Sequence, residues 1–415
     1  TYYSTAGGTL NPNTLTFWKT ARNGTGTSPA NFTSGDIFVV QGSGNGGTTP
    51  HLITTNTNWT ISGTNSKLQI ENGASLTSSN QITLNSNTTF QIDNGGTYVH
   101  NNTGTPSTSI FGGTESFGAS STVSINQWIN NTTVITTGVT LPFGNLTINN
   151  SSFAGNWNQA WTGSINLCAG NLTVTTTGGG EFRFTRTGTT TVTVTGNYSQ
   201  AANVVNLSSG NNAAVTFNVG GNFTLTNGSF NVADNNGNTN IVTVTGNTTV
   251  SSTGTNGIVM TTSSGNAGTS GTFQTTDFTA NGTSSRMIDF GDLGTGHQFR
   301  IKGNFSKSGT GAFYTTSTTL VGSFVFNKAG TQTFSYSGAT SQYTNYIINS
   351  GSTLQMLTGL TLGTGTVPIS SITVNSGATI DLGSQVITAG NNTDPQFTLS
   401  SGAKIITANA TGAQG

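Results

Sequence analysis

Short stretches in which apolar residues alternate with threonine recur along the chain, for example at residues 172–175, 192–195 and 223–225. A period of two puts alternate side chains on opposite faces of a β-strand, so the apolar side chains face inward and the threonines face outward. Glycine and asparagine separate these stretches, and both tolerate the positive φ that tight turns require. The pattern predicts many short strands joined by tight turns.

The predicted strands belong to a repeat of 25 or 26 residues, marked by glycine, asparagine, a residue that is usually apolar or aromatic, and a hydroxyl residue. The clean copies are Gly144-Asn145-Leu146-Thr147, Gly170-Asn171-Leu172-Thr173, Gly196-Asn197-Tyr198-Ser199, Gly221-Asn222-Phe223-Thr224 and Gly246-Asn247-Thr248-Thr249. A degenerate copy follows at residues 276–279, and a clean copy returns at 303–306. A regular period of this length indicates stacked structural repeats.

A second motif, Ile70-Glu71-Asn72-Gly73-Ala74-Ser75-Leu76, has similar copies at residues 92–98, 348–354, 374–380 and 399–405. Its last two intervals are 26 and 25 residues, so both motifs share one period and belong to one architecture. About 25 residues accommodate about three short strands with their turns, and coils stacked ~4.8 Å apart place each strand beside its equivalent. We therefore predict an all-β fold, a parallel β-helix (β-solenoid) with coils of about 25 residues.

The two ends of the chain differ from this repeat. Residues 1–60 lack the clean motifs and contain the aromatic residues Tyr2, Tyr3, Phe17, Trp18 and Trp59. Because a terminal coil exposes an unpaired edge, we interpret residues 1–60 as the first coils with an aromatic N-terminal cap, and residues 61–415 as the solenoid body. Nothing comparable closes the C-terminus, so we expect the native protein to continue beyond residue 415 or this edge to meet another molecule.

The composition narrows the functional classes. Charged residues are only 5% of the chain, and 11 basic residues balance 11 acidic ones, which argues against a nucleic-acid partner. No stretch approaches the ~20 apolar residues of a membrane-spanning helix. The single cysteine, Cys168, cannot form an internal disulfide, and a buried, unreactive thiol is expected there. The chain starts at Thr1 without a signal segment, so we take it as a mature chain whose targeting segment has been removed.

The first residues resemble a known group of proteins. Tyr2-Tyr3-Ser4, Phe17-Trp18, Asn23-Gly24-Thr25-Gly26 and residues 30–33 and 36–40 are similar to the start of large repetitive surface proteins of Bacteroidota-type bacteria, and the later coils resemble their β-helical bodies. The resemblance implies export by the type IX secretion system, whose machinery would be a partner during export, and an extracellular location on the bacterial cell surface. Many such proteins are adhesins. The C-terminal sorting domain that this export route uses is not visible in the chain.

A β-helix can also carry a polysaccharide-cleaving site, which needs clustered carboxylates or acidic calcium ligands. Most of the acidic residues here stand alone. Glu71 and Asp93 are 22 residues apart, about one coil, but their places in matched turns predict exposed turn carboxylates. His51, His100 and His297 lie far apart, and no Cys/His spacing indicates zinc. We therefore predict no enzyme activity, no cofactor and no metal site.

Two segments are candidates for ligand binding. The densest charged window, residues 286–302, contains Asp289, Asp292, His297 and Arg300, which could bind a cation or a polar ligand. The alternative is a solvated loop held by ordinary ion pairs. Trp157 and Trp161, flanked by Asn and Gln, could stack on sugar rings. The alternative is that they cover the side of the solenoid.

The hypothesis that follows is an extracellular structural or adhesive surface protein, a rigid β-solenoid that self-assembles into filaments or acts as an adhesin stalk. A neutral, repetitive polar surface permits close self-association. Surface glycans and other cell-surface proteins are the further partners expected. The alternative is a carbohydrate-binding module or a polysaccharide lyase or hydrolase on a β-helix scaffold.

Overall fold

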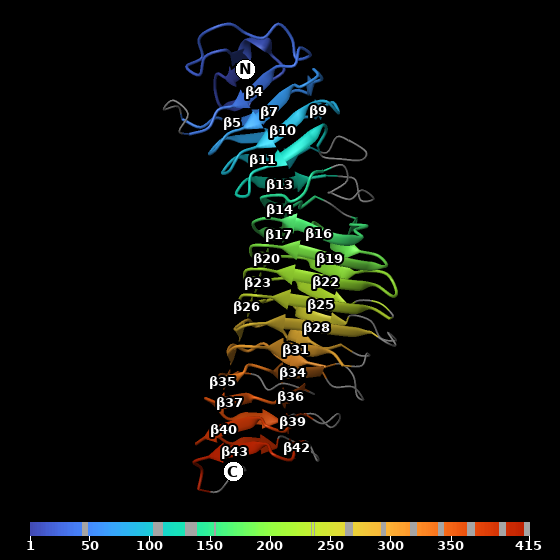
Figure 1. Cartoon of the computed structure of the whole chain (residues 1–415), viewed down its shortest axis with the longest axis vertical. Coiled ribbons are helices and arrows are strands. Elements are labelled where there is room, and N and C mark those ends of the chain that lie inside the picture. The colour runs from blue at the N-terminus through green and yellow to red at the C-terminus, as the bar shows by residue number, and fades with distance from the viewer. Residues whose placement is uncertain are drawn as a thin grey trace. The chain divides into compact units, whose positions relative to one another are not determined.

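The predicted β-solenoid is confirmed. The computed structural model describes residues 1–43, 49–102, 111–128, 139–152, 155–233, 235, 237–261, 269–291, 296–315, 322–338, 344–362, 370–389 and 396–410. These residues form β-strands and one 3-10 helix, η1 (Leu15–Phe17), and none of their helices is long and apolar enough to cross a membrane. Strands pair in parallel with the equivalent strands about 25 residues away, as β23 (Phe223–Leu225) does with β26 (Thr248–Val250) (Figure 1).

The chain divides into two compact units. Unit 1 comprises Thr1–Gln159, Ile165–Glu181 and Val194–Gly196, and unit 2 comprises Ala160–Ser164, Phe182–Thr193 and Asn197–Gly415. The predicted boundary after residue 60 falls inside unit 1. Between residues 160 and 196 the chain passes back and forth between unit 1 and unit 2. The strands in or next to this part are β15 (Trp157–Asn158), β16 (Gly163–Cys168), β18 (Glu181–Thr185) and β19 (Thr189–Val194).

Unit 1 contains three ladders of hydrogen-bonded strands. The first has the order β12 (Thr114–Phe117), β10 (Thr89–Ile92), β7 (Lys67–Ile70), β4 (Ile37–Val40), β1 (Tyr2–Ser4), β3 (Trp18–Lys19). The second runs β2 (Gly8–Leu10), β5 (Leu52–Thr55), β8 (Ser75–Ser78), β11 (Thr97–Asn101), β13 (Thr122–Gln127), β14 (Asn145–Asn149), β17 (Leu172–Thr176). The third pairs β6 (Trp59–Ile61) with β9 (Ile82–Leu84). Only the β1–β3 pair among these ladders is antiparallel.

Unit 2 repeats the arrangement with more coils. One ladder runs β20 (Tyr198–Gln200), β23, β26, β29 (Phe278–Ala280), β32 (Phe305–Lys307), β35 (Gly330–Tyr336), β37 (Ser352–Met356), β40 (Thr379–Gly383), β43 (Lys404–Thr407). A second runs β22 (Ala214–Val219), β25 (Thr239–Val244), β28 (Ser270–Thr275), β31 (Gln298–Ile301), β34 (Gly322–Phe326), β36 (Thr344–Ile348), β39 (Ser371–Val374), β42 (Gln396–Leu399). A third runs β21 (Val204–Ser208), β24 (Ser229–Ala233), β27 (Asn256–Thr261), β30 (Arg286–Asp289), β33 (Phe313–Tyr314). The last pairs β38 (Leu360–Leu362) with β41 (Ile387–Ala389).

Aromatic side chains stack through the interior of unit 2 because the register aligns them. Phe278, Phe305 and Phe334 occupy the same position in successive strands and are all buried. The rings of Phe305 and Phe334 lie almost parallel, with centroids 4.7 Å apart. Phe273 and Phe299 form a second such pair at 4.8 Å. Each ring therefore covers the next, and every coil shields apolar surface of its neighbours.

The Gly-Asn motif has a structural explanation. In unit 2 the second residue of the motif accepts a hydrogen bond through its side-chain oxygen, and the donor is the backbone N–H of the equivalent residue one coil later. We call these acceptors the asparagine ladder; they are Asn197, Asn222, Asn247, Asp277 and Asn304. The preceding glycine is needed for close approach, since a Cβ at Gly246 would lie 2.5 Å from the Asn222 side-chain oxygen. The degenerate copy fits because the Asp277 carboxylate accepts the Asn304 N–H in the same way, at 2.6 Å.

The N-terminal aromatic residues pack in the interior of unit 1. Trp18, Phe38 and Trp59 are almost completely buried. The indoles of Trp18 and Trp59 stack with centroids 5.2 Å apart, and Phe38 meets Trp18 edge-on at 5.3 Å. Of the five aromatic residues named for the cap, Trp18 and Trp59 are buried in this cluster, and Tyr2, Tyr3 and Phe17 are half-buried.

One buried histidine in unit 1 has no charged partner. His100 on β11 is 3% exposed; its Nδ1 lies 3.3 Å from the Tyr98 hydroxyl, and its Nε2 has no hydrogen-bond partner. Burial lowers the pKa of His100 to about 4, so the imidazole is neutral near neutral pH. Its equivalents in the neighbouring coils are Ser78 and Ile125.

We predict that Phe305→Ala lowers the free energy of unfolding by about 3–5 kcal/mol, because it opens a cavity in the stacked interior. The matched control is Ser306→Ala on the outer face of the same strand, which should change it by less than about 0.5 kcal/mol. Urea denaturation followed by circular dichroism measures both values. Equal losses in the two variants would contradict the inward and outward assignment of β32.

We also predict that acidification destabilises the fold through His100. Between pH 6.5 and about 4 the unfolded chain binds a proton at this position and the folded chain does not, so stability falls as the pH falls through this window. The loss reaches about 3 kcal/mol at pH 4. His100→Leu should flatten this part of the curve of unfolding free energy against pH. If the curves of the wild type and of His100→Leu run parallel, a group other than His100 causes the loss of stability at low pH.

Candidate functional site

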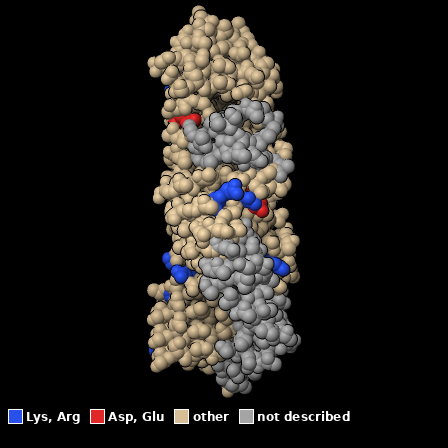
Figure 2. Space-filling view, turned by 90° about the vertical axis from the view of Figure 1, so that its right-hand side faces the viewer, with Lys and Arg blue, Asp and Glu red and all other residues tan. Residues whose placement is uncertain are grey.

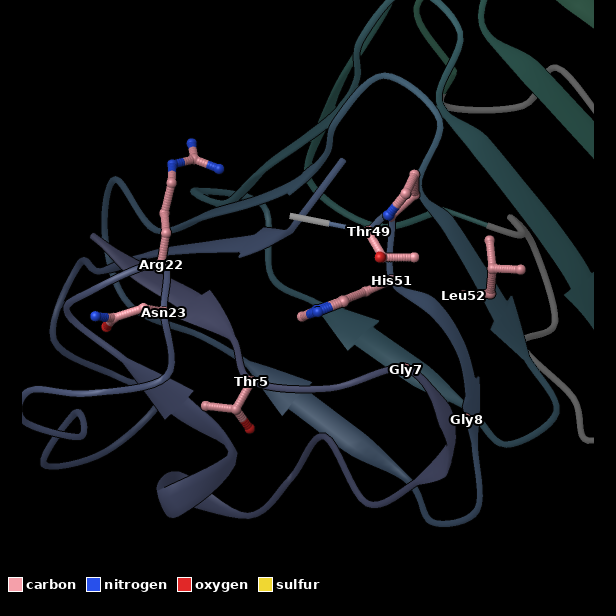
Figure 3. Close-up of a pocket in the computed structure, with 9 residues that line it drawn as sticks. Thr5, Gly7, Gly8, Arg22, Asn23, Thr49, His51 and Leu52 are labelled. Carbon is pink, nitrogen blue, oxygen red and sulfur yellow. The ribbon is translucent and has the colours of Figure 1, made fainter. Parts of the chain in front are cut away.

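The candidate site is a shallow hollow of about 540 Å³ in unit 1. Its lining comes from the chain after β1, the loop after β3 and the segment that leads into β5: Thr5, Gly7, Gly8, Arg22, Asn23, Thr49, Pro50, His51 and Leu52. Figure 3 shows Thr5, Arg22 and Asn23 on one side and Thr49 and Leu52 on the other, with the His51 imidazole extending between them. Three separate segments therefore meet here because β1 pairs with β3 and β2 pairs with β5.

Arg22 is held in place by two different contacts. Its Nη1 and Nη2 donate to the two carboxylate oxygens of Glu71 at 2.8 and 2.6 Å, which is the bidentate geometry of a strong ion pair. Its guanidinium carbon lies 4.2 Å from the centre of the Tyr3 ring. The hydrogen bonds to Glu71 raise the pKa of Arg22. Glu71 is buried, and its Oε2 also accepts the N–H of Gly42 at 3.0 Å.

His51 is oriented by a buried serine. The Ser4 hydroxyl accepts the backbone N–H of Gln41 at 3.1 Å and lies 2.7 Å from His51 Nδ1. Because a hydroxyl group can accept twice and donate once, the tautomer of the ring decides which of these two atoms donates. Burial lowers the pKa of His51, which favours the neutral ring. Ser4 is completely buried, so its hydroxyl orients His51 and is not presented to a substrate.

The hollow therefore offers hydrogen-bonding groups without excess charge. The Nε2 atom of His51 donates in one tautomer and accepts in the other. The amide nitrogen of Asn23 is a donor, because the Asn23 oxygen already accepts from the N–H and the hydroxyl of Thr25. The positive charge of Arg22 is balanced by Glu71. This chemistry suits a neutral ligand rich in hydroxyl groups rather than an anion.

In the charged window, the described residues are bonded to their own neighbours. Asp289 on β30 is buried; it accepts from Arg286 Nη1 at 3.0 Å and from the N–H of Gly291 at 2.8 Å. His297 is 5% exposed, and its Nδ1 accepts the N–H of Gly271 at 2.9 Å. Arg300 on β31 donates to Gln298 Oε1 at 2.7 Å. Asp292 lies outside the described residues.

Arg286 fixes Asp289 while lying 4.5 Å from the Tyr314 ring, which is the ion pairing of the alternative. The solvated loop of that alternative is not seen at residues 286–289 and 298–301, which form the strands β30 and β31. Within the described ranges, no group of three or more His, Cys, Asp or Glu side chains is placed to hold a metal ion. The ligand-binding role predicted for Asp289, His297 and Arg300 stays a prediction.

The two predicted sugar-stacking tryptophans are both inside the protein. Trp157 on β15 is 4% exposed and meets Trp128 edge-on at 5.8 Å. Trp161 is 3% exposed and packs against Phe184 at 5.4 Å, and its carbonyl accepts from the hydroxyls of Thr185 and Thr190. Neither indole presents a face to solvent, so the geometry favours the packing role over sugar stacking.

Sequence reasoning missed the role of Glu71. Its place in a turn predicted an exposed carboxylate, whereas the structure buries it against Arg22, 49 residues earlier. The next equivalent, Asp93, is half-buried and accepts from the amide nitrogens of Gln69 and Gln91. Cys168 is completely buried, and burial raises the pKa of its thiol.

Comparison of the chain with protein-family models, with curated proteins and with solved structures found no match. The site must therefore be interpreted from its own chemistry.

We predict that Glu71→Gln lowers the free energy of unfolding by about 1–3 kcal/mol, because it leaves the partly buried Arg22 guanidinium without its carboxylate. Asp93→Asn is the matched control, since it makes the same chemical change one coil later, where the partners are neutral amides. Its effect should be about 0.5 kcal/mol. Thermal denaturation of both variants measures the difference, and equal losses would argue against a special role for the Arg22–Glu71 pair.

Proposed function

We propose that the chain is a structural and adhesive β-solenoid of the bacterial cell surface, without catalytic activity. The observation that carries the proposal is a column of hydroxyl groups on the outer face of unit 2. The strand register aligns them in successive coils: Ser199, Thr224, Thr249, Thr279, Ser306 and Ser335. Such a repeated neutral surface presents the same chemistry at every coil, which suits contacts with a long partner or with a second copy.

Two features that join neighbouring coils support a mechanical role. Between residues 197 and 334 of unit 2, aromatic rings stack from coil to coil in the core, and the asparagine ladder joins the turns. Charged side chains are also sparse on the surface: Figure 2 shows Lys, Arg, Asp and Glu as a few separated spots on the face that it draws. Low surface charge permits close approach between molecules. The location on the cell surface and the type IX route rest on the resemblance of residues 2–40.

The hollow beside Arg22 supports the second candidate, a carbohydrate-binding module. It offers the amide of Asn23 and the imidazole of His51 beside a charge-balanced Arg22, which is chemistry suited to sugar hydroxyls. The two candidates are compatible, because an adhesin stalk that binds a surface glycan would use both the rigid coils and the hollow.

Electron microscopy and a cleavage assay together test the proposal. Ordered fibres of the purified 415-residue protein would support a filament subunit, and isolated rods would support an adhesin stalk. Incubation with a panel of neutral and acidic polysaccharides should release no new reducing ends and no unsaturated sugars. Product formation at catalytic rates would overturn the non-catalytic proposal in favour of a hydrolase or lyase.

A further inference from the structure

The second sequence motif forms a hollow in the last coils of unit 2. The hollow measures about 720 Å³ and is lined by Asn349, Ser350, Asn375, Ser376 and Ser400. All five residues belong to three copies of one turn, which follows β36, β39 and β42. Every lining side chain carries an amide or a hydroxyl group, and none carries a charge. Its size falls within the ~300–1,000 Å³ range of small-molecule sites.

Backbone hydrogen bonds hold the three turns of this groove in a stack. The N–H of Gly351 donates to the carbonyl of Gly377 at 3.2 Å, and the N–H of Gly377 donates to the carbonyl of Gly402 at 3.4 Å. The strands before the turns are in register, with Ile348 beside Val374 and Val374 beside Leu399. The polar side chains therefore repeat at the ~4.8 Å spacing of neighbouring strands.

A hydrogen bond between two lining residues sets the direction of their amides. Asn375 Nδ2 donates to Asn349 Oδ1 at 3.0 Å. This contact uses the side-chain oxygen of Asn349 but not the amide hydrogens of Asn349, which remain as donors. It also does not use the side-chain oxygen of Asn375, which remains as an acceptor. The hydroxyl groups of Ser350 and Ser376 are exposed beside them. The groove thus presents donors and acceptors in a fixed order, which reduces the ordering cost of binding.

The same motif makes a chemically different hollow in unit 1. That hollow, of about 440 Å³, includes Asn72, Asp93 and Asn94. The Asp93 carboxylate there is fixed by Gln69 Nε2 at 2.7 Å, so a charge lies at its wall. Copies of one turn motif therefore contribute to hollows in both units, and of these two hollows the one in unit 2 is lined entirely by neutral groups.

We propose that the groove formed by Asn349, Ser350, Asn375, Ser376 and Ser400 binds a neutral, extended glycan, about two sugar rings of a β-1,4-linked chain lying across the three coils. Sugar hydroxyl groups both donate and accept, which matches the amide and hydroxyl lining. The ~4.8 Å repeat of the coils is close to the rise of one ring in such a chain. This inference deepens the proposed adhesive function and rests on it, since it names the ligand that an adhesive solenoid would hold.

The test is a titration of the isotopically labelled 415-residue protein with cellotetraose, a neutral β-1,4-linked tetrasaccharide, followed by nuclear magnetic resonance. The side-chain amide signals of Asn349 and Asn375 should shift in a saturable manner. Asn349→Asp keeps the oxygen that accepts from Asn375 and removes the amide donors, so binding should weaken about 3–10-fold. Ser376→Ala should weaken it by a smaller factor and leaves the amide pair intact.

The matched control is Asn222→Asp, which makes the same change on an exposed residue of the asparagine ladder. Asp277 shows that this ladder accepts a carboxylate, so the variant should fold and bind cellotetraose like the wild type. Shifts confined to His51 and Asn23, or binding that Asn222→Asp weakens and Asn349→Asp does not, would overturn the groove proposal. So would the absence of saturable shifts with cellotetraose. None of these results would affect the scaffold function, which the fibre and cleavage experiments test separately.

Discussion

Every coil in this fold depends on the hydrogen bonds that its backbone makes with the coils on either side. A parallel ladder sets one register for all strands, and a slip of one residue would exchange the inner and outer faces. This constraint explains why the composition can be so poor in apolar residues. Each coil needs only a few inward side chains, such as Phe278, Phe305 and Phe334, because the neighbouring coils cover the remaining surface.

The same constraint turns sequence repeats into side-chain columns. Once the register is set, equivalent residues lie directly above one another, and any hydrogen bond that one coil makes to the next can recur. The asparagine ladder, the hydroxyl column from Ser199 to Ser335 and the Asn349–Asn375 pair are three results of this one rule. The surface of such a protein is then made of columns of equivalent side chains.

The period, the strands and the inward direction of the apolar residues could be predicted because they depend on local alternation and repeat length. The Arg22–Glu71 pair could not be predicted, since its partners are 49 residues apart and no sequence motif links them. For Trp157 and Trp161 the sequence left sugar stacking and packing both open, and only the structure shows that the two indoles are buried. The Gly-Asn motif was visible in the sequence, but its use as an acceptor appears only when the coils are stacked.

Asp277 has a consequence for the lifetime of the molecule. Asparagine side chains slowly lose ammonia in water, and aspartate is one product. In the asparagine ladder only the side-chain oxygen accepts the bond from the next coil, and Asp277 already accepts that bond as a carboxylate. Conversion of a ladder asparagine to aspartate would add a negative charge but keep the acceptor, so the contact between coils can outlast the chemical ageing of the residues that make it.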